Sequence, residues 1–328
     1  MAPTGDPSPD ALTITLGTRK SQLAMVQTYH VRDALQRLYP KYHFPIVPMS
    51  TTGDKILDVA LFKIGEKSVF TKELELALHD RKVDLVVHSL KDLPTTLPPG
   101  MLLGAVLERE NPHDAVVFNA KFKDHTLESL PAGSVIGTSS VRRIAQLKRR
   151  FPTLQFQDIR GNLNTRLAKL DADDSPFAGI ILAVAGLNRI DMGHRISQIL
   201  DPSLSLHAVS QGALGVECRE DDTRIIELLA PLNHYETRIR CTSERSLMRT
   251  LEGGCSVPIG VNSRFEGRTL HLRGLVASVD GKQVAEDDAD IEIPEDASAE
   301  SYANELGELV AKKLLDLGAR AILDQIHH

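Results

Sequence analysis

Tryptophan is absent from this chain of 328 residues, aromatic side chains make up only 4%, and the formal net charge is −6. Few aromatic residues, an acidic balance and the lack of an extended basic face count against a nucleic-acid-binding protein. No apolar run approaches the roughly 18 residues that a membrane span needs. The first ten residues, MAPTGDPSPD, lack the basic and apolar regions of a secretory signal. We therefore expect a cytoplasmic protein with no nucleic-acid or membrane partner.

Cysteine is scarce as well. Cys218, Cys241 and Cys255 are odd in number and none has CxxC spacing, which argues against a disulfide framework, and we expect no metal site. Cys218 falls in a predicted strand and Cys241 in a predicted helix, so both are expected to be small core residues. Cys255 instead follows two glycines on a predicted turn, where an accessible thiol suits covalent attachment of a large group. The end of a helix just before it does not activate a thiol.

The chain does contain a basic segment within an acidic body. Residues 137–166, GTSSVRRIAQLKRRFPTLQFQDIRGNLNTR, hold seven Lys or Arg and a single acid, and six of the seven are arginine. Guanidinium groups form two-pronged hydrogen bonds to carboxylate or phosphate. Such a segment in an acidic protein indicates a local pocket for a multiply anionic ligand.

Two strand-to-helix junctions are predicted within this segment. The first places Arg142 and Arg143 in the opening turn of a helix, behind two serines with N-cap chemistry. Cations there oppose the helix dipole, so an anion held at the helix terminus explains them better. The second junction repeats the pattern, with Arg160 and Arg166 around the start of a helix near residue 163. A solvated basic face is the alternative, and it suits the cations at 148–150 in the last turn of their helix.

Apolar strand-like runs alternate with helical patterns over the first two thirds of the chain, which is typical of α/β sheets whose strand ends carry functional loops. Strands are predicted at 13–18, 45–50, 83–89, 134–138, 154–159, 180–185 and 213–218, and helices at about 21–39, 71–81, 141–150 and from 163. The remainder differs. A helix from about 236, strands near 257–262, 270–278 and 288–293, and an amphipathic helix around 302–314 predict a small α+β domain.

A further group of polar side chains follows the strand predicted at 83–89. The sequence VDLVVHSLKD brings His88, Ser89, Lys91 and Asp92 to the end of that strand. Acids and bases at the end of a buried strand favour catalysis, because desolvation there shifts their pKa values. His88 taken alone is expected to be a hydrogen-bonded core residue.

The chain resembles the porphobilinogen deaminase (hydroxymethylbilane synthase) family in nine segments that keep the family's order: TLGTRKSQLA, TTGD, KIGEKSVFTKELE, VHSLKDLPT, GTSSVRR, RGNLNTRL, LAVAGLNR, QGALGVE and LEGGCSVPIG. The resemblance implies an α/β fold, with two domains like those of periplasmic binding proteins around a cleft and a smaller α+β C-terminal domain. We expect the first domain at 1–110 with a returning segment at about 211–232, the arginine-rich second at 111–210, and the third at 233–328.

The resemblance also implies a monomeric transferase that joins four porphobilinogen molecules head to tail, with release of ammonia, to give the hydroxymethylbilane of haem biosynthesis. Its dipyrromethane cofactor would be held by a thioether to Cys255, and Asp92 would be the central catalytic group, assisted by Lys91. By the same resemblance, the cofactor-binding residues are Arg19, Ser21, Lys91, Asp92, Thr138, Ser139, Ser140, Arg142, Arg143, Arg160, Gly161, Arg166, Arg189 and Cys255. Substrate would be bound by Arg19, Ser89, Arg160, Arg166 and Gln211, and Asp54, Lys63, Lys67 and Phe70 would belong to a mobile lid.

One departure from the family pattern is Ser210, which stands where glycine usually precedes the QGA motif, at the connection between the first two domains. The alternative to an enzyme is a non-catalytic two-domain binding protein for small dicarboxylate-type anions. That reading explains the arginines, but it leaves Cys255 and Asp92 without a role.

Overall fold

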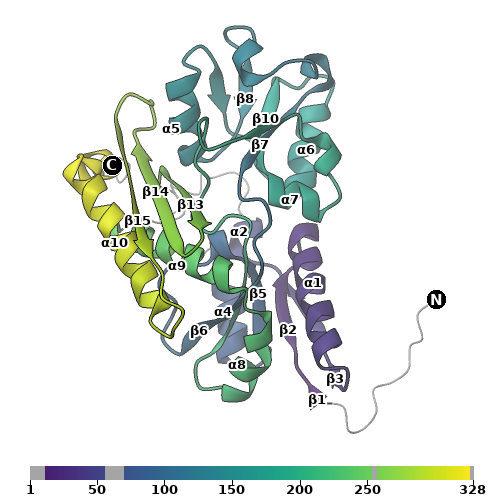
Figure 1. Cartoon of the computed structure of the whole chain (residues 1–328). Coiled ribbons are helices and arrows are strands. Elements are labelled where there is room, and N and C mark those ends of the chain that lie inside the picture. Colours follow the sequence, from purple (N-terminus) through teal and green to yellow (C-terminus); the bar gives the residue numbers. More distant parts are fainter. Residues whose placement is uncertain (1–11, 56–69, 253–256, 326–328) are drawn as a thin grey trace.

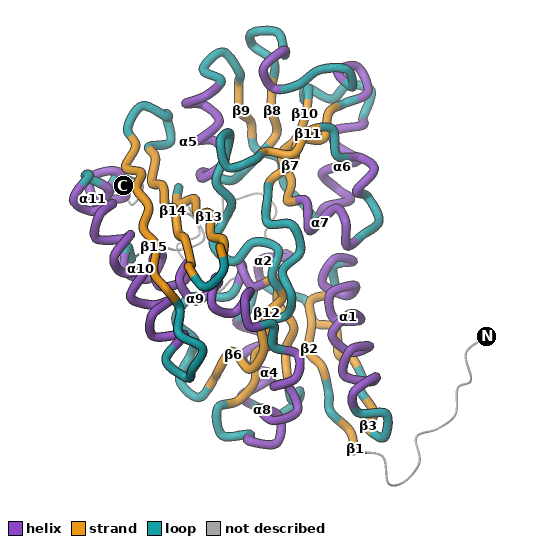
Figure 2. Tube along the Cα trace, viewed as in Figure 1, coloured by secondary structure: helices purple, strands orange, loops and turns teal. Residues whose placement is uncertain are grey.

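The computed structural model describes residues 12–55, 70–252 and 257–325. In this part of the chain the strands form two five-stranded sheets, a three-stranded sheet and a short pair of β1 (Leu12–Thr13) with β3 (Tyr42–His43). The first large sheet lies below the second, and the three-stranded sheet lies beside them (Figure 1). Figure 2 shows helices flanking all three sheets. The structure thus confirms the α/β class with a smaller α+β part. No helix among the described residues is long and apolar enough to cross a membrane.

The first large sheet has the order β4-β2-β5-β12-β6, with β12 antiparallel to both of its neighbours. Leu85 packs on one face with α1 and α8, whereas Val86 packs on the other face with α4. This alternation buries the apolar part of β5 on both sides, as is typical of a strand inside a sheet that is covered by helices on both faces. The elements are β2 (Leu16–Arg19), β4 (Ile46–Met49), β5 (Leu85–Ser89), β6 (Met101–Val106), β12 (Leu214–Arg219), α1 (Gln22–Leu38), α2 (Thr52–Lys55), α4 (Lys72–His79) and α8 (Thr223–Leu229).

The second large sheet has the order β11-β7-β10-β8-β9. Ile180 packs towards α6 and Ile181 towards α5, and burying such a side chain stabilises the fold by about 1.5–3 kcal/mol. The strand predicted at 180–185 ends at Ala183, because Val184 begins a helix. The elements are β7 (Asp114–Phe118), β8 (Val135–Gly137), β9 (Gln155–Gln157), β10 (Gly179–Ala183), β11 (Gln198–Leu200), α5 (Val141–Arg150), α6 (Leu163–Asp171) and α7 (Val184–Arg189).

The third sheet is an antiparallel meander, and α9 and α10 pack on it through Leu247, Val310 and Leu314. The strand predicted from 288 begins earlier, at Val284. The sequence pattern missed its first residues because several of them are acidic, and acidic residues are poor strand formers. The elements are β13 (Ile259–Glu266), β14 (Thr269–Ala277), β15 (Val284–Glu292), α9 (Tyr235–Thr250), α10 (Ala299–Asp316) and α11 (Ala319–Asp324).

The chain passes twice between the two large sheets, once between β6 and β7 and once between β11 and β12. In the second connection Ser210 and Gly212 have φ values of 60° and 91°. A Cβ at Gly212 would lie 2.3 Å from the carbonyl oxygen of Glu110 in the first connection, so the two connections are tightly packed. Ser210 holds a left-handed conformation that glycine adopts without strain, which explains why the family usually has glycine there.

Candidate functional site

Lys91 and Asp92 lie in a single 3₁₀ turn, η1 (Leu90–Asp92), directly after β5. Leu90 and Leu93 are fully buried, and the Leu90 N–H donates to the carbonyl oxygen of Ala213 at 3.0 Å. These anchors hold the two polar side chains half-buried at the strand end, where the sequence predicted them. Burial lowers the pKa of the Lys91 ammonium, although Asp92 opposes the shift.

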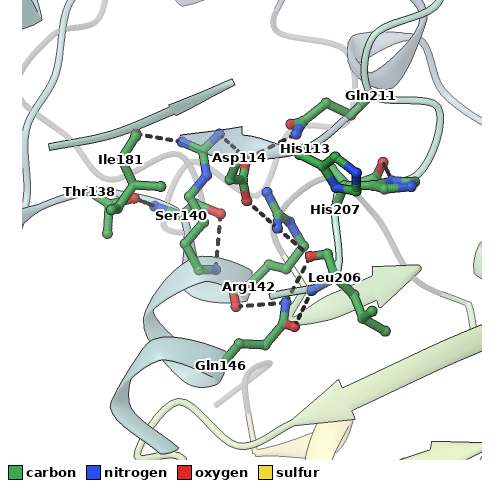
Figure 3. Close-up of polar contacts among 12 residues, drawn as sticks. His113, Asp114, Thr138, Ser140, Arg142, Gln146, Ile181, Leu206, His207 and Gln211 are labelled. Carbon is green, nitrogen blue, oxygen red and sulfur yellow. Dashed lines mark hydrogen bonds and ion pairs between the residues drawn. The ribbon is translucent and has the colours of Figure 1, made fainter. Parts of the chain in front are cut away.

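Arg142 and Arg143 lie in the first turn of α5, whose N-cap is Ser140. Both pair with one carboxylate: Arg142 Nη1 donates to Asp114 Oδ2 and Arg143 Nη2 to Asp114 Oδ1, each at 2.7 Å (Figure 3). Burial would raise the pKa of Asp114, but Arg142 and Arg143 outweigh it and hold that pKa well below its usual range. Part of the hydrogen-bonding capacity of the two arginines is therefore already committed within the protein.

The second junction places Arg160 and Arg166 on either side of Gly161, whose φ is 110°. The Gly161 carbonyl accepts a hydrogen bond from Arg166 Nε at 2.9 Å, and Arg160 lies 3.4 Å from Asp158. Burial, Arg143 and Arg160 lower the pKa of Arg166 to about 10, against the opposing charge of Asp92. Arg166 therefore stays protonated at neutral pH in crowded, cationic surroundings.

Electrostatic coupling joins the two junctions to the end of β5. The negative charge of Asp92 raises the pKa of Lys91, at the end of the first sheet, and also the pKa of Arg166, beside the second sheet. Cations outnumber acids in this region, and positive charges that are partly desolvated and close together favour a bound polyanion. The cations are Lys91, Arg142, Arg143, Arg160 and Arg166, and the carboxylates are Asp92, Asp114 and Asp158.

Gln211 and Arg19 also lie at this region's margins. Gln211 Nε2 donates to Asp114 at 2.9 Å, and Gln211 Oε1 accepts from Lys91 Nζ at 3.4 Å. Arg19, at the end of β2, has its guanidinium 4.3 Å from the ring centroid of Phe70, the described member of the predicted lid. This stacking is a cation–π contact, which holds the guanidinium plane against the aromatic ring.

The predicted hydroxyl-bearing residues have local roles in the structure. Ser21 caps α1 by accepting from the Ala24 N–H at 3.4 Å, and Ser89 Oγ accepts from Gln27 Nε2 at 2.8 Å. Thr138 Oγ1 accepts from the Ser140 N–H at 3.2 Å, and Ser139 Oγ donates to the Ile159 carbonyl at 2.9 Å. The contacts of Thr138 and Ser139 lie at the junction before α5, and the Ile159 carbonyl that Ser139 binds directly precedes Arg160.

Arg189 contacts the second connection between the large sheets. It ends α7 and donates to the Gly212 carbonyl at 2.6 Å, at the second connection between the sheets. Burial lowers its pKa, and Glu110 opposes the shift. The structure therefore brings Arg189 to the second connection, at the residue after Gln211, and its role in cofactor binding stays a prediction.

Cys255, Lys63 and Lys67 lie outside the described residues, and the side chain of Asp54 does as well, so their roles in cofactor attachment and in a lid stay predictions. The other two cysteines are buried as expected, and burial raises the pKa of Cys241 and raises that of Cys218 to about 11. Neither thiol is suited to nucleophilic attack.

His88 is a core residue, as the sequence predicted. It is buried, and its Nε2 lies 2.9 Å from Glu217 Oε2. Asp114, by contrast, was not predicted. It lies 28 residues before Arg142, close to the expected boundary between the first two domains, and no local pattern marks it as the arginines' partner.

A site of this kind defines a class: α/β proteins that bind a polyanion with arginines from strand-to-helix junctions, next to a carboxylate at a strand end. Residues 14–227 match the family described as porphobilinogen deaminase, dipyrromethane cofactor binding domain, and residues 238–316 match the porphobilinogen deaminase C-terminal domain. The chain belongs to the porphobilinogen deaminase family.

Curated relatives agree over nearly the whole length. A porphobilinogen deaminase of Nostoc sp. is 55% identical over 314 residues, which cover 96% of this chain and 94% of the relative. That of Synechococcus elongatus is 54% identical over 319 residues and covers 97% of each. Among solved structures, the VFT2 domain of Bordetella pertussis BvgS is 13% identical with a TM-score of 0.40, over 71% of this chain and 92% of that domain. A likeness at that score says nothing about function.

Proposed function

We propose that this chain is a working porphobilinogen deaminase. It joins four porphobilinogen molecules head to tail with loss of four molecules of ammonia, and water releases the linear tetrapyrrole hydroxymethylbilane. The observation that carries the proposal is the position of Asp92 and Lys91 in the turn after β5, where Gln211 links Lys91 to the carboxylate that pairs with Arg142 and Arg143. A carboxylate among cations suits a reaction whose substrates are anionic and whose pyrrole ring becomes cationic as ammonia leaves.

The described residues fit a cofactor that carries several carboxylates. The Nε–H of Arg143 is buried and, within the described part of the chain, has no acceptor. A ligand carboxylate would satisfy this donor and would relieve the crowding of charge around Arg166. Bound through Cys255, the dipyrromethane supplies the terminal pyrrole carbon to which substrate is added.

In this reaction Asp92 is the catalytic residue. Its carboxylate accepts hydrogen bonds from pyrrole N–H groups, stabilises the positive charge that develops on the substrate ring, and carries a proton between steps. Lys91 adds a positive charge at the same strand end, where it binds a pyrrole carboxylate. Arg19, Arg160 and Arg166 bind the acetate and propionate groups of incoming substrate, each by two-pronged hydrogen bonds.

The binding-protein alternative is not favoured, because the family assignment covers both the cofactor-binding and the C-terminal parts of the chain. Intact mass spectrometry separates the two readings. The enzyme, expressed with its substrate present, carries an adduct of two pyrrole units and consumes porphobilinogen with release of one ammonia for each molecule used. A bare polypeptide that binds porphobilinogen without consuming it would support the alternative.

We also propose that the chain acts as a cytoplasmic monomer of three domains with the boundaries given above. The return of β12 into the first large sheet and the separate packing of α9 and α10 on the third sheet support that division. Size-exclusion chromatography with light scattering tests the monomer, and limited proteolysis tests the boundaries.

A further inference from the structure

Asp114 is the buried carboxylate on which several cations of the site converge. It is the first residue of β7, it is only 1% exposed, and its backbone is paired on both sides, with Ala183 of β10 and Leu200 of β11. Its Oδ2 accepts from Arg142, and its Oδ1 accepts from Arg143 and from Gln211, at 2.7, 2.7 and 2.9 Å. The position of β7 between two strands and the three hydrogen bonds fix the orientation of the Asp114 carboxylate.

The two guanidinium groups are fixed in turn. Arg142 Nη1 donates to the Leu206 carbonyl at 2.7 Å as well as to Asp114, and Arg143 Nη1 donates to the Ile181 carbonyl at 2.8 Å. Each arginine is thus held at two points by the protein itself (Figure 3). A long, flexible cation that is already held in one rotamer loses less entropy when it binds a ligand.

Gln211 extends the arrangement to the end of β5. It lies in the second connection between the large sheets, and its amide bridges Asp114 and the ammonium of Lys91. The main chain of Gln211 is held as well, because its carbonyl accepts from Arg109 Nε at 2.8 Å. One carboxylate therefore sets the positions of cations that come from both sides of the site.

A buried carboxylate next to two arginines could serve stability alone, since removing one partner of a buried pair leaves an uncompensated charge. Two observations favour a role towards the ligand. The Nε–H of Arg143 is left without an acceptor among the described residues, and the chain from Asp114 through Gln211 ends on Lys91, next to the catalytic Asp92. A pair that served stability alone requires neither feature.

We propose that Asp114 is a positioning residue, which aligns Arg142 and Arg143 directly and Lys91 through Gln211 for the carboxylates of the growing pyrrole chain. This inference rests on the proposed function. It assigns to Asp114 no contact with substrate and no proton transfer.

The test compares Asp114→Asn with wild type and with Asp84→Asn. Asp84 is the matched control, because it accepts from the Thr15 N–H at 2.7 Å and lies 3.4 Å from Arg219 in the first sheet, away from the site. Each protein is prepared without cofactor and is then given porphobilinogen, and intact mass follows the acquisition of two pyrrole units. Circular dichroism establishes that each variant is folded at the temperature used.

We expect Asp114→Asn to acquire the adduct at least about tenfold more slowly, and the loaded protein to show a KM raised about tenfold with kcat changed much less. Asp84→Asn should lose thermal stability but keep the wild-type rate and KM. An Asp114→Asn protein that loads and turns over like wild type while it melts at a lower temperature would overturn the inference. Failure of the wild type itself to load would instead refute the proposed function.

A second variant covers the case in which Asp114→Asn does not fold. Gln211→Met keeps the length of the side chain but removes the bridge between Asp114 and Lys91. The inference requires this variant to acquire the adduct more slowly than wild type, and an unchanged rate with an unchanged KM would overturn it.

Discussion

Arg109 and Glu244 form a buried two-point ion pair, with Nη1 to Oε1 at 2.6 Å and Nη2 to Oε2 at 3.0 Å. Arg109 belongs to the first connection between the large sheets, and Glu244 belongs to α9 beside the third sheet. The same carboxylate accepts the N–H of Ser210, in the second connection, at 2.7 Å. Burial would raise the pKa of Glu244, but Arg109 outweighs it and lowers that pKa to about 2. The side chain of Glu244 thus binds residues of both connections between the large sheets.

Glu244→Gln should therefore destabilise the fold strongly. The variant leaves Arg109 buried without its counter-charge, and the expected loss in free energy of unfolding is about 3–5 kcal/mol, measured by urea denaturation. Glu300→Gln is the control, because Glu300 pairs with Arg238 at the surface and its loss should stay below about 1 kcal/mol. Equal losses in the two variants would contradict the role of Glu244.

His207, next to this pair, should make the fold sensitive to acid. Burial, together with Arg109, lowers the pKa of His207 to about 3 from 6.5, although Glu244 opposes the shift. As the pH falls from about 6.5 towards 3, the unfolded chain binds a proton that the folded chain does not, so stability falls with pH. One such proton corresponds to about 1.4 kcal/mol per pH unit.

His207→Gln should remove that dependence, measured as the slope of unfolding free energy between pH 6 and pH 4. His30→Gln, at an exposed position of α1, should leave the slope unchanged. Burial also lowers the pKa of His113, and this histidine is present in all three proteins. The contribution of His207 is therefore the difference between the slope of wild type and the slope of His207→Gln. A slope in His207→Gln equal to that of wild type would show that this group does not carry the effect.

The sequence predicted those elements whose own pattern decides their structure. The apolar run at Gly179–Ala183 is buried on both faces, and Ser140 caps α5 as its chemistry suggests. β7 was missed because it begins with a buried acid. β6 and α8 were missed as well, although every residue of β6 is apolar or glycine. Local propensity fails where tertiary contacts decide the structure.

The sequence predicted the site to about the same extent as the fold. The residue types at the two junctions and at the end of β5 indicated an anion site beside a carboxylate, and the structure places Asp92 near enough to Arg166 for its charge to raise the pKa of Arg166 against the effect of burial. The pairing of Arg142 with Asp114 and the position of Arg189 at the connections were not predictable, because both depend on contacts between residues far apart in the sequence.

Arginine variants should separate ligand binding from folding. Arg160→Leu removes a partly exposed cation that lies 3.4 Å from the exposed carboxylate of Asp158, so stability should change by less than about 1 kcal/mol while kcat/KM falls at least about tenfold. Arg142→Leu should lower kcat/KM as well, and it should also cost about 3–5 kcal/mol of stability because Asp114 loses a buried partner. Activity within a factor of about two of wild type in Arg160→Leu would exclude direct ligand contact.

Cys255→Ser should abolish cofactor attachment and activity while the fold survives, because serine cannot form the thioether. Intact mass should show the bare chain, and the colour reaction of dipyrroles with an aldehyde reagent should vanish. Cys241→Ala is the control: its thiol is buried, so the adduct should remain. A normal colour in Cys255→Ser would move the attachment point to another cysteine.

Asp92→Asn separates catalysis from binding. Asparagine keeps the shape of the side chain and can still accept a hydrogen bond, but it can neither offset a developing positive charge nor carry a proton. Turnover should fall by a factor on the order of 10² or more, whereas substrate affinity and the covalent modification of Cys255 should change far less. Asp84→Asn, directly before the start of the same strand, is the matched control and should keep turnover near the wild-type value. Quench-flow measurement of the first release of ammonia decides the matter, since an Asp92→Asn protein that deaminates substrate at the wild-type rate would transfer the catalytic role to another group beside Lys91 and Arg166.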